Sequence, residues 1–217
     1  MVEIVAHRGA NELASLSTPR PWADAIELDV HLRRGRLEVR HAKCLPFTRR
    51  FWERWYLLPQ DTPVPTLREV LAGVDARAHL MVDLKGWSPR LSRLVIDAVA
   101  DRDQLTVSTK AWWLLLPFRA LPQARSLRSA GNRFELWMLR RLRLPRHGVV
   151  VHSRLLDAEL VAELKARNGQ VFTWAIADST EASTLVAWGV DGLIVDDPGV
   201  LDGLGLPPTV DSTEHPG

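Results

Sequence analysis

Cysteine is nearly absent from this chain of 217 residues, which holds only Cys44. No disulfide can therefore form within one chain, as is typical of proteins of a reducing compartment. Long apolar runs are missing too: the longest, from Ala111 to Phe118, is interrupted by Pro117 and is far short of the ~20 residues of a membrane-spanning helix. The N-terminus has no basic region followed by an apolar stretch, so we expect no signal peptide and a cytoplasmic protein.

A strong excess of charge of one sign is also missing. The chain has 28 Lys and Arg against 26 Asp and Glu, a formal net charge of +2, which is too even to indicate a nucleic-acid-binding protein. Hydrophobic residues make up 46% and charged residues 25%, which excludes a disordered, collagen-like or coiled-coil chain and leaves ample material for a core. Tyrosine occurs once, whereas tryptophan occurs nine times.

Short apolar runs alternate with helical patterns along most of the chain. The expected strands are residues 3–7, 25–30, 37–41, 79–85, 105–109, 124–129, 148–152, 171–176 and 192–195, and the expected helices are residues 66–74, 88–102, 157–168 and 180–188. Such alternation indicates parallel strands in an α/β fold, and this number of strands favours a closed (β/α)8 TIM barrel as a single domain over residues 1–206. Residues 207–217 are rich in Pro, Thr, Ser and Gly and are expected to be a disordered tail.

The second and third expected strands are too close together for a crossover helix. Only a few residues around Arg33-Arg34-Gly35-Arg36 separate them. The pair is therefore expected to be an antiparallel β-hairpin after the second strand, with one of its strands accessory to the barrel.

Polar side chains occupy one face of the second expected strand. Glu27, Asp29 and His31 alternate with apolar residues and so share a face, which in a barrel would lie inside or at the mouth. Two buried carboxylates need a compensating cation, and the hard ions Mg²⁺ and Ca²⁺ prefer oxygen ligands. The alternative is an ordinary solvent-facing strand, and this segment alone does not separate the two.

Further polar residues stand at the ends of other expected strands. Asp83 and Lys85 share a face, either as part of the same polar patch or as a structural ion pair. His7 and His41 each end a strand; a single histidine is more often structural, but two at the same end of a barrel as the carboxylates could donate and accept protons near neutral pH. Trp174 either lines the pocket or packs within the barrel.

These motifs occur in a characteristic order: His-Arg-Gly at 7–9, Glu-x-Asp at 27–29, a strand ending in His41, Asp-x-Lys at 83–85, a strand with Trp174, and Gly-Val-Asp-Gly-Leu-Ile-Val-Asp-Asp-Pro at 189–198. The ordered set, from about residue 4 to 201, resembles the glycerophosphodiester phosphodiesterase family. No single motif decides the resemblance, and the segment at 189–198 is its most recognisable part.

The resemblance implies a barrel with its site at the C-terminal ends of the strands. It implies one divalent cation, Mg²⁺ or Ca²⁺, on Glu27, Asp29 and Asp83, a general acid/base pair of His7 and His41, and phosphate contacts from Arg8 and Lys85. Trp174 is a further candidate for substrate contact, from its strand. The implied reaction cleaves a glycerophosphodiester into glycerol phosphate and an alcohol, with a neighbouring substrate hydroxyl as the attacking group. A cation and two basic side chains suit the negative charge that grows in such a transition state.

Departures from the family pattern keep two alternatives open. Ala42 stands where the family has Asp, Asp83 where it usually has Glu, and Asn11-Glu12 only partly replaces a Glu-Asn-Thr signature. The Asp at position 83 and the short front segment also resemble the spider-venom sphingomyelinase D (phospholipase D) relatives, whose cysteine pattern is missing here. Ala42 supports a second alternative, a barrel without turnover that binds a phospholipid headgroup or a protein partner.

Three segments combine aromatic and basic residues: 47–58, 112–119 and 134–146. Trp, Leu and Arg together are typical of surfaces at a membrane interface, so the segments could admit a lysophospholipid or contact a bilayer peripherally. Packing of helices against the barrel wall explains them as well and is the favoured interpretation. Nucleic acid is not an expected partner, given the even charge balance.

Overall fold

The computed structural model describes residues 1–11, 20–45, 48, 50–53, 56–59, 61–142 and 148–205. The expected tail at 207–217 lies outside this part of the chain, as do Glu12 and portions of the aromatic segments at 47–58 and 134–146.

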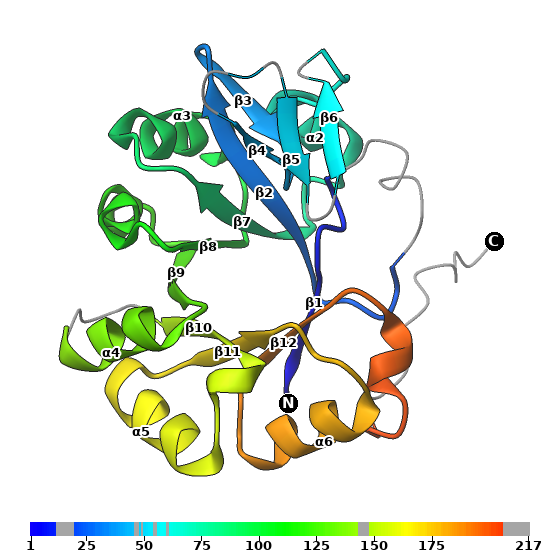
Figure 1. Cartoon of the computed structure of the whole chain (residues 1–217), viewed down its shortest axis with the longest axis vertical. Coiled ribbons are helices and arrows are strands. Elements are labelled where there is room, and N and C mark those ends of the chain that lie inside the picture. Colours follow the sequence, from blue (N-terminus) through cyan, green and yellow to red (C-terminus); the bar gives the residue numbers. More distant parts are fainter. Residues whose placement is uncertain are drawn as a thin grey trace.

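Eight parallel strands form a closed barrel, which confirms the predicted fold class (Figure 1). They are β1 Glu3–Ala6, β2 Ala25–Arg33, β7 His79–Lys85, β8 Leu105–Thr109, β9 Ala124–Ala130, β10 Gly148–His152, β11 Val171–Trp174 and β12 Gly192–Val195. The barrel closes because β1 pairs with β12 on one side and with β2 on the other.

Helices connect the strands on the outside of the barrel (Figure 1). They are α2 Leu67–Gly73, α3 Pro89–Val99, α4 Arg133–Arg141, α5 Ala158–Asn168 and α6 Ser179–Ala187, with the 3₁₀ helices η1 Trp112–Ala120, η2 Ser153–Leu155 and η3 Pro198–Leu201. Thr66 and Glu69 form a capping box that begins α2, within the helix expected at 66–74. The helix expected at 88–102 is shorter than predicted, and η1 and α4 lie in the aromatic segments at 112–119 and 134–146, for which helix packing was the favoured interpretation.

The predicted hairpin is present. β3, Arg36–Val39, pairs antiparallel with the outer end of β2. Arg34 and Gly35 have φ angles of 49° and 81°, the left-handed pair that a two-residue hairpin turn uses. β3 ends at Val39, so His41 follows the strand rather than ending it, which corrects the predicted boundary.

A small antiparallel sheet, which was not predicted, packs beside this hairpin. It consists of β4 Lys43–Cys44, β5 Arg50–Glu53 and β6 Tyr56–Pro59. Phe51 anchors it: the side chain is buried, and the guanidinium groups of Arg33 and Arg40 lie 5.3 and 4.7 Å from the ring centroid. The sheet is therefore fixed to the part of the hairpin that leads to His41.

Apolar side chains fill the space inside the barrel as well as the layer under the helices. The interior cluster contains Val5, Ala25, Met81, Leu127, Val150, Phe172 and Ile194. Gly192 leaves room for the Phe172 ring, since a Cβ there would lie 2.1 Å from a ring carbon. On β2, Leu28 and Val30 pack outward in the layer under the helices, which leaves Glu27 and Asp29 facing inward as the alternation predicted.

Candidate active site

The three acidic residues predicted as metal ligands meet at the C-terminal ends of the strands. Asp29 and Asp83 are paired across β2 and β7, and Glu27 precedes Asp29 by two residues on the same face. One carboxylate oxygen of each lies within 4.8 Å of the others. Glu27 and Asp29 are 4% and 1% exposed, so the cluster is largely shielded from water.

The three carboxyl groups of the cluster outnumber the two cationic side chains beside them, Lys85 and Arg8. The Lys85 Nζ lies 2.8 Å from Asp29 Oδ1 and also pairs with Asp83. Burial, reinforced by the charge of Asp29, raises the pKa of Glu27 well above its usual value. Burial acts in the same direction on Asp29, but Lys85 and the amide of Asn11 outweigh it and lower the pKa of Asp29.

Such a cluster fits a hard divalent cation. All three side chains offer carboxylate oxygens, which Mg²⁺ and Ca²⁺ prefer. Burial disfavours ionised Glu27, and a bound cation would offset that cost. The donor set therefore matches the predicted cofactor on chemical grounds.

Asn11 positions one of the acids, a role that the sequence patterns did not reveal. Its Nδ2 donates to Asp29 Oδ2 at 2.8 Å, and its Oδ1 accepts from the Asp29 backbone N–H at 2.9 Å. The two bonds hold the carboxylate against its own strand. The available signal was the partial match of Asn11-Glu12 to the Glu-Asn-Thr signature, shortly after β1.

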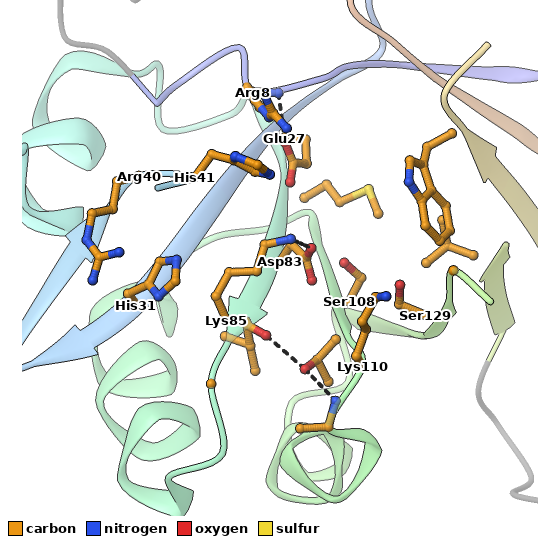
Figure 2. Close-up of a pocket in the computed structure, with 18 of the residues that line it drawn as sticks. Arg8, Glu27, His31, Arg40, His41, Asp83, Lys85, Ser108, Lys110 and Ser129 are labelled. Atoms are coloured by element: carbon orange, nitrogen blue, oxygen red, sulfur yellow. Dashed lines mark hydrogen bonds and ion pairs between the residues drawn. The ribbon is translucent and has the colours of Figure 1, made fainter. Parts of the chain in front are cut away.

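The turn after β1 directs Arg8 toward the acids (Figure 2). Arg8 adopts a φ angle of 52°, and its backbone N–H donates to Glu27 Oε2 at 2.7 Å. Its Nε lies 3.8 Å from Asp29 Oδ2. Gly9 is required next, because a Cβ there would lie 2.9 Å from the side chain of Ile26.

Both predicted histidines line one cavity of about 880 Å³, together with Glu27 and Asp83. His7 follows β1, and its Nδ1 lies 2.8 Å from Asp196 Oδ1 after β12. His41 points from the segment after β3 toward the acidic cluster (Figure 2). The structure thus brings together the two imidazoles and the acids, whereas their catalytic roles stay a prediction.

The rest of the cavity wall contains residues that the sequence patterns only partly indicated. Trp174 lines it, with its ring centroid 5.4 Å from that of His152. Strand β11 ends at Trp174, before the predicted end at Ile176, because Ala175 turns the chain with a φ angle of 65°. His31 lines the other side as its face predicted, and burial together with the charge of Arg40 lowers its pKa to about 3, so it is neutral at pH 7.

Known proteins with similar sequences and structures point to the same kind of site. Residues 38–200 match the profile of the Glycerophosphoryl diester phosphodiesterase family. The chain belongs to this family. The match includes His41, Asp83, Lys85 and Trp174, whereas His7, Arg8, Glu27 and Asp29 precede it. The family is one of phosphoric diester hydrolases.

Similar proteins and structures agree with this membership. A 56-residue segment, 26% of this chain, is 34% identical to a glycerophosphodiester phosphodiesterase of Arabidopsis thaliana and spans 17% of that relative. The glycerophosphodiester phosphodiesterase of Thermotoga maritima has the same fold, with a TM-score of 0.72 and 19% identity over 94% of this chain and 98% of the other. A phosphodiesterase of Oleispira antarctica, in complex with the product sn-glycerol-3-phosphate, has a TM-score of 0.68 and 20% identity over 91% of this chain and 94% of the other.

Proposed function

We propose that this protein hydrolyses glycerophosphodiesters to glycerol phosphate and a free alcohol at the mouth of the barrel. The observation that supports it is the convergence of two imidazoles, two carboxylates and Lys85 on one cavity, with Asp29 directly behind the two carboxylates. The product complex of the Oleispira antarctica relative supports the glycerol phosphate part of the substrate.

In this proposal Glu27, Asp29 and Asp83 hold one divalent cation, Mg²⁺ or Ca²⁺. When bound, the cation supplies positive charge to the phosphate oxygens as the transition state forms. Lys85 and Arg8 add fixed positive charge on the same side, and the raised pKa of Lys85 keeps its ammonium charged at neutral pH, because Asp83 and the other acids outweigh the effect of burial.

The two histidines transfer the protons. Asp196 engages His7 through Nδ1, which orients the ring and leaves Nε2 for proton transfer. One imidazole accepts the proton of the attacking substrate hydroxyl, and the other donates a proton to the leaving alcohol oxygen, which leaves a cyclic phosphate. Water then opens this ring to glycerol phosphate, with the acid and base roles of the two imidazoles exchanged. Asn11 keeps the Asp29 carboxylate in place meanwhile.

Lysophospholipids are a second candidate substrate class. The exposed Trp87 ring stands at the lip of the cavity, where an acyl chain could lie outside the barrel while the phosphodiester enters it. A phospholipase D- or sphingomyelinase D-like activity would use the same cavity, and a barrel that only binds a phospholipid headgroup is the alternative without turnover.

One assay separates these possibilities. Release of alcohol is measured from a panel of glycerophosphodiesters, lysophospholipids and sphingomyelin, with Mg²⁺, with Ca²⁺ and with a chelator. We expect turnover that depends on the divalent ion and is lost in His7→Ala, whereas His79→Gln, at the opposite end of the barrel, retains it. Binding of substrate without turnover under every metal condition would contradict the proposal.

A further inference from the structure

The exposed large apolar side chains of the described residues gather around one half of the barrel mouth. Apart from Met1 and Leu142, they all lie in segments that leave the C-terminal ends of β7, β8 and β9, or in the sheet β4–β6. Trp87 follows β7 and Trp113 follows β8, and their ring centroids are 4.9 Å apart. Phe134 follows β9 on α4 and is 65% exposed. Three consecutive strands thus place aromatic rings at the same rim.

Internal packing does not account for this exposure. In η1, the buried side chains Trp112, Leu114, Leu115 and Phe118 attach the helix to the barrel, whereas Trp113 and Leu116 remain nearly half exposed. On α4, Leu139 is buried, whereas Phe134 and Trp137 stack on each other in solvent, with their centroids 6.0 Å apart. The favoured interpretation from the sequence, packing against the barrel wall, therefore explains only part of these segments.

The charged residues at the barrel mouth are also distributed unevenly between its two halves. The segments after β7, β8 and β9, residues 86–93, 110–120 and 131–137, contain five Arg or Lys and one carboxylate, Glu135. The segments after β10, β11 and β12, residues 153–160, 175–183 and 196–202, contain seven carboxylates and one basic residue, Arg154. In Figure 1 the first set is coloured green and the second yellow to red. We call the first set the basic aromatic rim and the second the acidic rim.

Aromatic rings beside Arg and Lys are the combination that holds a protein at an anionic membrane surface. Trp and Phe partition into the headgroup region, and each basic residue gains from the negative surface potential. Leu116 and Leu57 add aliphatic surface, which suits acyl chains and offers a nucleic acid neither stacking nor hydrogen bonds. The acidic rim would be repelled by the same surface.

We propose that the basic aromatic rim docks on a bilayer that contains anionic lipid. The acidic rim then points away from the bilayer, so the barrel sits tilted, with the Trp87 side of the cavity at the level of the headgroups. Docking needs no turnover and therefore does not depend on the proposed activity.

The test measures co-sedimentation of the full chain with vesicles. One set contains phosphatidylcholine alone, and the other contains phosphatidylcholine with a quarter of phosphatidylglycerol. We expect binding to the second set at about 0.1 M salt and its loss near 1 M, where the screening length falls from about 10 Å to about 3 Å. The double variant Trp113→Ser/Phe134→Ser should bind on the order of tenfold more weakly or worse, since it removes two inserted rings.

Leu142→Ser is the matched control. Leu142 is 50% exposed and stands just beyond the other end of α4, away from the rim, so its replacement should leave vesicle binding unchanged. Trp113 and Phe134 do not line the cavity, so hydrolysis of a water-soluble glycerophosphodiester separates a failure of docking from a failure of catalysis. Absence of vesicle binding, equal binding by the double variant, equal loss in Leu142→Ser, or binding to a single-stranded oligonucleotide instead of vesicles would each overturn the proposal.

Discussion

Both ends of the barrel hold charged side chains, and they differ in how completely these are paired. At the N-terminal ends of the strands, Arg125 donates to both carboxylate oxygens of Glu3 at 2.7 and 2.6 Å and also to Thr106 Oγ1. His79 completes the group, with Nε2 2.9 Å from the same Thr106 oxygen. At the C-terminal ends, Lys85 pairs with Asp29 and Asp83, Arg8 lies beside Asp29, and burial raises the pKa of Glu27.

From this difference we expect the N-terminal end to serve stability and the C-terminal end to bind a ligand. A paired network satisfies its own groups and loses stability when one member is removed. A cluster with surplus negative charge is costly in the free protein and gains when a cation binds. In TIM barrels the C-terminal end is also the usual place for catalysis. We therefore expect substitutions at the two ends to have opposite consequences for activity and stability.

The largest expected effect is that of His7→Ala on catalysis. General acid/base groups contribute about 10²–10⁴-fold to rate, so kcat/KM should fall by this factor. The unfolding temperature should change little, because the His7 side chain contacts the exposed Asp196 rather than the core. Steady-state kinetics and thermal unfolding of the same preparation check this. A variant with a wild-type rate would remove His7 from the mechanism.

Disruption of the paired end should cost stability instead. Arg125→Met leaves Glu3 without its bidentate partner in a partly buried site, and we expect a loss of about 2–3 kcal/mol in the free energy of unfolding. Denaturant titration measures this loss, and the activity per folded molecule should stay near wild type. A loss of activity with unchanged stability would contradict a structural role for the N-terminal network.

Glu27→Gln, at the C-terminal end, should lower activity without lowering stability. Gln can still accept the hydrogen bond from the Arg8 N–H, while one buried charge is removed. Activity should fall by at least about tenfold. In chelator, however, the variant should be as stable as wild type or more stable by about 1 kcal/mol, because the folded protein no longer holds a buried carboxyl group that is costly to ionise. Matched unfolding curves in chelator test this, and a clear destabilisation would contradict it.

The smallest effect concerns the pH dependence of stability at the paired end. Burial, with Arg125 nearby, lowers the pKa of His79 below its usual value although Glu3 opposes this. The unfolded chain therefore binds this proton first, so wild-type stability should decline as pH falls below about 6.5. His79→Gln should show a shallower decline between about pH 6.5 and 5 in unfolding curves. Identical slopes would exclude His79 as the cause.

The sequence predicted the barrel because its strands are short apolar runs with clear boundaries. The strands at 79–85, 105–109, 148–152 and 192–195 have the predicted bounds, and the period of two on β2 predicted which side chains face inward. Long-range pairing was not visible in the sequence. Strands β4–β6 are short and lie in an aromatic, basic segment without alternation, and Phe51 is buried in contact with Arg33 and Arg40 of the preceding segment.

In the candidate site, too, local patterns were predictable from the sequence and long-range contacts were not. Strand ends predicted the convergence of His7, His41 and the acids, because parallel strands bring their C-terminal ends together. The contact of Asn11 with Asp29 and that of Asp196 with His7 link residues 18 and 189 positions apart, which local patterns do not show. Ala42 is buried beside the segment that holds His41, and nothing in the structure explains why Asp is replaced there.

The most direct test of whether Glu27, Asp29 and Asp83 bind a cation is calorimetric titration of Mg²⁺ and of Ca²⁺ into chelator-treated protein. We expect one saturable site for at least one of the ions, a rise in unfolding temperature on saturation, and loss of both effects in Asp83→Asn and Glu27→Gln but not in Glu3→Gln. Binding that is absent from wild type, or that persists unchanged in Asp83→Asn and Glu27→Gln, would contradict the assignment of this cluster.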